Sequence, residues 1–69
     1  MAKERKSAQE LATLITDKVG VRELYVRVRR DHAYGWEPTV EDAPGDLIGF
    51  QRRVEEIALR LRMQYDLRD

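Results

Sequence analysis

Apolar residues recur at two different spacings along this chain, and each spacing predicts a different kind of element. From Ser7 to Val19 they fall three or four residues apart, the repeat of one helical face. From Leu24 to Arg29 they alternate with polar residues, as in a strand with one buried face. From Leu47 to Tyr65 the helical repeat returns and lasts five turns. The pattern predicts two helices separated by strands.

The first helix has clear start and stop signals. Ser7 followed by Glu10 is the spacing of a capping box, in which each side chain bonds the backbone N–H of the other residue. Gly20 stands where a left-handed residue closes a helix. We therefore expect a helix over residues 7–19, and we expect the charged residues 1–6 to be frayed.

The segment after Leu24 predicts an antiparallel hairpin with a long loop. Asp31 and Gly35 favour a turn between residues 30 and 35, and a second arm continues from there to residue 41. Trp36 is the best candidate in this arm for a core position. Pro38 cannot donate a backbone hydrogen bond, so the second arm is irregular or lies at an edge.

Together these elements predict one small α+β domain over residues 1–69. Its order is helix–strand–strand–helix, with the two helices packed on one face of an antiparallel β-hairpin. A chain this short buries only about 60% of the surface that its unfolded form exposes. Association with another chain would therefore add useful stability.

The composition argues against an enzyme or a metal protein. The chain has no cysteine, one histidine, and no nucleophile elbow, phosphate-binding glycine loop or paired-carboxylate motif. His32 stands beside Asp31 in the expected loop, where a solvated imidazole is the ordinary outcome. We expect no catalytic residue, metal, cofactor or small-molecule ligand.

A second row of apolar residues on the last helix is the main candidate for function. Leu59, Met63 and Leu67 are spaced i, i+4 and i+8 beside the core stripe, with Ile48 on the same side. This ridge either packs on the first helix and widens the core, or forms a contact surface for a homodimer or an unidentified protein partner. The outer edge of the strand at 24–29 is a second route to a dimer.

Nucleic-acid binding is the alternative function. Tyr25, Arg27 and Arg29 share the outer face of the hairpin, and the tail adds Lys3, Arg5 and Lys6. However, 13 basic residues balance 13 acidic ones over the whole chain. Residues 23–46 hold three basic and six acidic side chains, a net charge of −3. A nucleic-acid interface usually needs a basic excess, so a solvated face is the better interpretation.

The chain gives no sign of export or of a membrane anchor. Its first residues are charged and lack the apolar segment of a secretory signal. No apolar run approaches the ~20 residues that span a bilayer. We expect a cytoplasmic protein.

Four short segments resemble a known group of sequences. They are SAQELATLI, VRVRR, GWEP and MQYDL, and together they extend over most of the chain. With them the chain resembles a family of short alphaproteobacterial proteins of unknown function. The resemblance implies a small cytoplasmic protein with helices flanking a hairpin, and it assigns no catalytic or binding residue.

Overall fold

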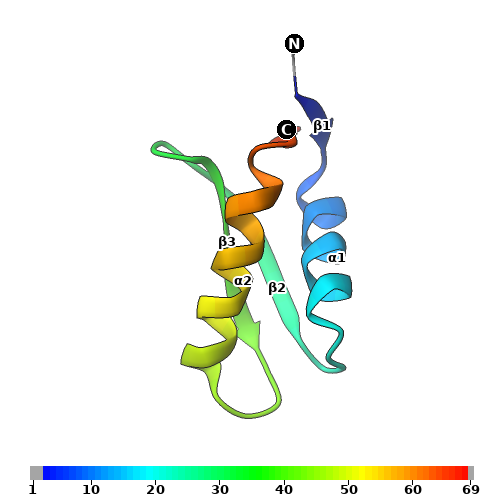
Figure 1. Ribbon diagram of the computed structural model, residues 1–69, viewed down its shortest axis with the longest axis vertical. Helices are drawn as coiled ribbons and strands as arrows, with labels where there is room; N and C mark the ends of the chain where they lie inside the picture. Colours follow the sequence, from blue (N-terminus) through cyan, green and yellow to red (C-terminus); the bar gives the residue numbers. More distant parts are fainter. Residues whose placement is uncertain (1–2, 69) are drawn as a thin grey trace.

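The computed structural model describes residues 3–68 and has two layers (Figure 1). The elements in chain order are β1 (Glu4–Lys6), α1 (Ala8–Val19), β2 (Tyr25–Asp31), β3 (Gly35–Asp42), α2 (Leu47–Leu61) and β4 (Tyr65–Leu67). β2 and β3 form an antiparallel hairpin, and β1 pairs with β4 in parallel. α1 packs against β2 and α2 against β3, which confirms the predicted α+β fold.

The core lies between the two helices and the hairpin. Its fully buried side chains come from α1, β3 and α2 and include Leu11, Ile15, Trp36 and Val54. Trp36 is 1% exposed, as expected from its place in the second arm. Its ring nitrogen Nε1 donates to the main-chain oxygen of Tyr65 at 3.2 Å, so the one polar atom of the ring is satisfied.

The residues that predicted the two ends of α1 form the expected interactions. The Ser7 hydroxyl accepts from the Glu10 N–H at 3.1 Å, and the Ser7 N–H donates to Glu10 Oε1 at 2.9 Å, which completes the capping box. Gly20 closes the helix in the left-handed region with φ 71°. The predicted start and end of this helix are confirmed.

The hairpin turn is shorter than expected. β2 continues to Asp31 and β3 begins at Gly35, so only three residues connect them instead of a long loop. Asp31 Oδ2 accepts from the N–H groups of Ala33 and Tyr34 at 3.0 and 2.8 Å, which holds the turn tight. Gly35 takes φ 88°, a value that residues with a side chain rarely adopt.

The second helix ends earlier than its apolar repeat predicts. α2 stops at Leu61, where the Met63 and Gln64 N–H groups turn back to the carbonyls of Arg60 and Leu61. Leu67 therefore lies in β4, partly buried against the core, and not on the helix. The expected helical ridge is wrong in this respect, because the apolar residues of a strand happened to continue the helical spacing.

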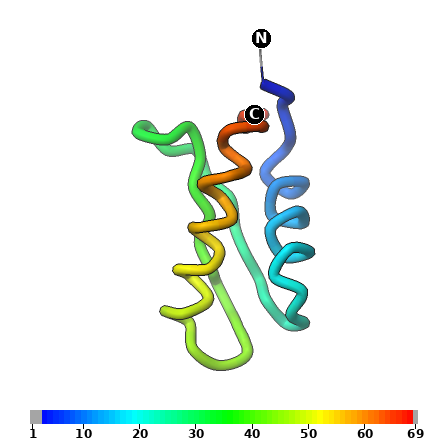
Figure 2. Tube along the Cα trace, in the orientation of Figure 1, coloured from blue at the N-terminus to red at the C-terminus, as the bar shows by residue number. Residues whose placement is uncertain are grey.

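The amino-terminal segment is also more ordered than expected. Residues 4–6 form β1, with Glu4 beside Tyr65 and Lys6 beside Leu67. The Arg68 N–H donates to the Lys6 carbonyl at 2.7 Å. The expected fraying of residues 1–6 is therefore wrong for 4–6, while residues 1–2 lie outside the described part. Figure 2 shows the first and last described segments, residues 4–6 and 65–67, side by side.

Candidate functional site

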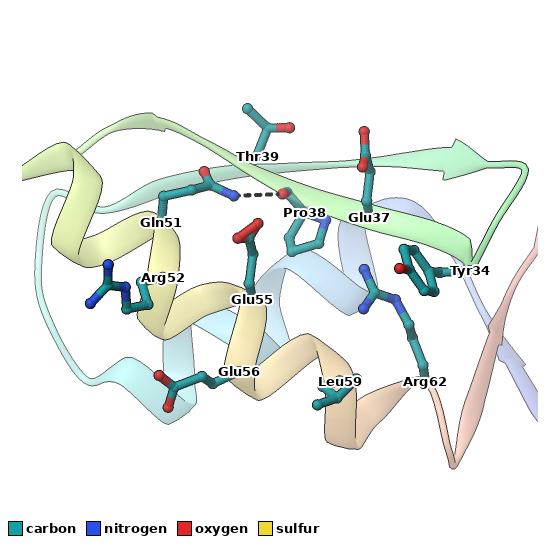
Figure 3. A pocket seen from close by; sticks show the side chains of 10 residues that line it. All are labelled: Tyr34, Glu37, Pro38, Thr39, Gln51, Arg52, Glu55, Glu56, Leu59 and Arg62. Atoms are coloured by element: carbon teal, nitrogen blue, oxygen red, sulfur yellow. Dashed lines mark hydrogen bonds between the residues drawn. The ribbon is translucent and has the colours of Figure 1, made fainter.

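A groove runs along the side of the molecule where α2 lies against β3 (Figure 3). Its volume is about 470 Å³, and its walls come from α2, β3 and the turn residue Tyr34. A second hollow of about 380 Å³ shares Gln51, Arg52 and Glu55 with it and extends to Leu47 and Ile48. The two hollows together follow α2 from its first turn to its last.

Gln51 of α2 forms hydrogen bonds with the main chain of β3, as a neighbouring strand would. Its carboxamide nitrogen donates to the Pro38 carbonyl at 3.1 Å, and its carboxamide oxygen accepts from the Val40 N–H at 2.8 Å. Pro38 lacks an N–H, and this gap falls on the same outer edge of β3, where no ladder bond is lost. One side chain thus satisfies two of the main-chain groups that the edge presents.

Arg62 closes the same edge at the other end of the groove. Its Nε donates to the Trp36 carbonyl at 2.8 Å. Its guanidinium carbon lies 5.0 Å from the centre of the Tyr34 ring and 5.4 Å from that of Trp36. Such contacts with aromatic faces are favourable, and Figure 3 shows the guanidinium beside Tyr34. With Gln51 and Arg62 in place, the outer edge of β3 is covered against strand addition.

The groove and the second hollow together contain most of the large apolar side chains that are exposed in the described residues. Six such side chains are exposed, and four of them line the two hollows: Tyr34, Leu47, Ile48 and Leu59. Ile48 is 76% exposed and Leu59 is 62% exposed. Exposed apolar groups along one side of a small protein are typical of a contact surface.

Two opposite charges lie between these apolar groups. Arg52 and Glu55 are exposed residues of α2 and line both hollows. Neither forms an ion pair or a side-chain hydrogen bond within residues 3–68. Their charges are therefore available to another molecule.

The structure separates the three residues predicted as an interaction surface. Leu59 and Met63 are both exposed near the end of α2, and Met63 is 77% exposed. Leu67 is partly buried in β4 and packs on the core. That Leu59 and Met63 contact a partner stays a prediction.

Sequence reasoning missed most of the groove. Ile48 was placed beside the ridge but was not chosen as a site, although it lies three turns before Leu59 on the same helix. That spacing was a usable signal. Tyr34 gave none, because its position depends on the tight turn at Asp31.

The candidate nucleic-acid residues lie on the opposite, outer face of the hairpin, among carboxylates. Arg27 Nε is 3.2 Å from Glu41 Oε2, and Arg29 stands opposite Glu37 in the strand register. Tyr25 is exposed beside them. This face alternates positive and negative charge and does not offer a continuous basic surface.

The two lysines of the tail also have acidic neighbours. Lys3 Nζ lies 3.8 Å from Asp66 Oδ1, and Lys6 Nζ lies 3.0 Å from Glu4 Oε2. The hydrogen bond to the Glu4 carboxylate raises the pKa of Lys6 above its ordinary value. These lysines therefore neutralise charges of their own strand pair.

Two further sites considered in the sequence, a metal site at His32 and the outer edge of β2, have few contacts in the structure. His32 is exposed in the turn, and residues 3–68 contain no group of three histidine, cysteine or acidic side chains that could hold a metal. The outer edge of β2, the second candidate for dimerisation, receives no hydrogen bond from a helix side chain of the described part. Within that part, neither helix has the length and apolar character to cross a membrane.

Comparison with known proteins adds no assignment. Protein-family models, curated proteins and solved structures were all searched, and none matches this chain. The resemblance to short alphaproteobacterial proteins stays a prediction.

Proposed function

We propose that this chain is a cytoplasmic, non-enzymatic protein-interaction module that associates with a second copy of itself through the outer side of α2. The observation behind the proposal is that Tyr34, Leu47, Ile48 and Leu59 are exposed along two adjoining hollows beside α2. Their exposure has an energetic cost in the single chain, which burial against another protein would remove.

The small size of the domain supports the same proposal. Its fully buried side chains are few, and a second layer on α2 would extend the core of a chain that buries little surface alone. Binding of nucleic acid has less support, because the carboxylates of Glu37 and Glu41 stand among Arg27 and Arg29.

Solution mass over a concentration series tests the proposal. The wild-type chain should shift from monomer to dimer as its concentration rises, and Leu59→Glu should move that transition to at least about tenfold higher concentration, because a charge would be buried in the contact. Tyr25→Glu is the matched control, since it changes an exposed apolar residue on the opposite face of the hairpin. A constant monomer mass up to about 1 mM would contradict self-association.

A further inference from the structure

The outer face of α2 has a symmetrical order of side chains. Ile48, Arg52, Glu55 and Leu59 follow one another at steps of four, three and four residues, which places them in one row along a helix. All four are exposed, while Val54 and Ala58 are on the buried side. Read from either end, the row is apolar, charged, charged, apolar, and the two charges have opposite signs.

This order fits a copy of itself in one orientation. We propose that two chains pair through antiparallel α2 helices, with Ile48 against the partner's Leu59 and Arg52 against the partner's Glu55. The two-fold axis then passes between residues 53 and 54, so every contact occurs twice. Such self-complementarity is what a two-fold dimer interface requires. The inference rests on the proposed function, and it specifies the geometry of that association.

The charges distinguish this arrangement from the parallel one. In a parallel pair each Arg52 would face the partner's Arg52 and each Glu55 the partner's Glu55, so both central contacts would be repulsive. In the antiparallel pair both contacts join opposite charges. Ile48 and Leu59 are separated by about 16 Å along the helix axis at 1.5 Å per residue, and the same separation on both chains brings the apolar ends into register.

The remaining side chains of α2 leave the row free for a partner. Gln51 of α2 and Arg62, the residue directly after α2, face β3 and are occupied by the hydrogen bonds to that strand. Arg52 and Glu55 form no ion pair with another residue of the described part. Met63 is exposed one turn beyond Leu59 and extends the apolar end of the contact.

Charge-reversal variants, alone and mixed with each other, test the antiparallel pairing of the two α2 helices. Arg52→Glu alone and Glu55→Arg alone each create like-charge contacts at both symmetry-related positions, so each should raise the dimer dissociation constant about tenfold or more. An equimolar mixture of the two variants should regain dimers, because Glu at 52 of one chain then faces Arg at 55 of the other. Arg53→Glu is the matched control, since it makes the same charge change one residue away on a different side of α2 and should leave the dissociation constant unchanged.

Cysteine cross-linking tests the register independently. The chain contains no cysteine, so every disulfide reports an introduced pair. A mixture of Ile48→Cys and Leu59→Cys should form the mixed disulfide under mild oxidation. Ile48→Cys alone should not cross-link, because the two copies of residue 48 would be separated by about 16 Å along the helix axis alone, and disulfides need Cα atoms within roughly 7 Å.

The outcomes separate the geometry from the function. A wild-type dimer that resists both charge reversals, or that cross-links residue 48 to residue 48, would overturn the antiparallel pairing and leave self-association standing. A wild-type chain that stays monomeric at every concentration would overturn both. Restored dimers in the charge mixture together with the mixed disulfide would establish the pairing.

Discussion

The two helices cover the same face of the hairpin but present different surfaces to solvent. α1 buries Leu11 and Ile15, and its outer side is polar, with exposed residues such as Thr13 and Asp17. α2 buries Val54 and Leu61 in a similar way, yet its outer side carries the exposed Ile48 and Leu59. Since one sheet and one core serve both helices, the apolar outer side of α2 is not a requirement of the fold. It is the feature on which the proposed self-association rests.

The helices also differ in what holds them in place. α1 is fixed by its own ends, through the capping box of Ser7 and Glu10 and through Gly20. α2 has a simpler start, where Asp46 accepts from the Ile48 N–H, and it is anchored along its length by the bonds of Gln51 and Arg62 to β3. The hydrogen bonds that fix the ends of α1 are therefore local, whereas those of Gln51 and Arg62 join α2 to another element, β3.

Among variants of the two helices, we expect Gln51→Leu in α2 to lower the free energy of unfolding more than Ser7→Ala in α1. It removes two hydrogen bonds and leaves the Pro38 carbonyl and the Val40 N–H without their partner. At about 1 kcal/mol for each bond, the free energy of unfolding should fall by about 2 kcal/mol. Urea denaturation measures this change.

Gln51→Glu is the control for that prediction. It keeps an acceptor for the Val40 N–H but sets a second acceptor oxygen against the Pro38 carbonyl, so its loss should be at least as large as that of Gln51→Leu. If Gln51→Leu unfolds at the same urea concentration as the wild type, the two hydrogen bonds from Gln51 to β3 contribute no measurable stability.

A smaller effect is expected for Ser7→Ala in α1. The hydroxyl that caps the Glu10 N–H is lost, and removal of such a cap costs about 1 kcal/mol. The same urea experiment applies, with Thr13→Ala as a control in the middle of the helix. If Ser7→Ala lowers the free energy of unfolding by more than Gln51→Leu does, the cap of α1 contributes more stability than the bonds of α2 to β3, and the prediction is wrong.

The smallest effect concerns the pH dependence of α1. Hydrogen bonds from Ser7, first its backbone N–H and then its hydroxyl, lower the pKa of Glu10 below its ordinary value of 4.5, and Arg68 contributes at a distance of 3.2 Å. Because the folded-state pKa is the lower one, the stabilisation is complete above about pH 4.5 and is lost as the pH falls through the folded-state value. The group is exposed, so salt screens part of the effect.

Glu10→Gln removes this titration. The difference in unfolding free energy between the wild type and Glu10→Gln should shrink as the pH falls below 4.5, and it should be constant above that value. Urea denaturation at a series of pH values measures it. A difference that stays constant through the acid range would show that the Glu10 carboxylate contributes no pH-dependent stability.

The sequence predicted what local interactions decide. The limits of α1 follow from Ser7, Glu10 and Gly20, which act within a few residues of one another, and Trp36 was placed in the core from the alternation of its arm. The β1–β4 pair was not predictable in this way. Two three-residue strands with mixed polarity carry no recognisable period, and their pairing depends on the whole chain between them.

The candidate site was predictable only in part. Leu59 and Met63 were identified because α2 has a strong repeat, while Leu67 was included because its spacing matched a helix that has already ended. The groove beside them needs β3 next to α2, and Gln51 gives no sign in the sequence that it replaces a strand. Tyr34 reaches Arg62 only because three residues form the turn.

The parallel pairing of β1 with β4 has a mechanical consequence. β1 leads into the domain and β4 runs out of it in the same direction, with Glu4 beside Tyr65 and Lys6 beside Leu67. Tension applied to residues 3 and 68 would slide one strand along the other, in shear. The hydrogen bonds between them would then share the force and break together, so this short strand pair is the part of the domain that first resists stretching.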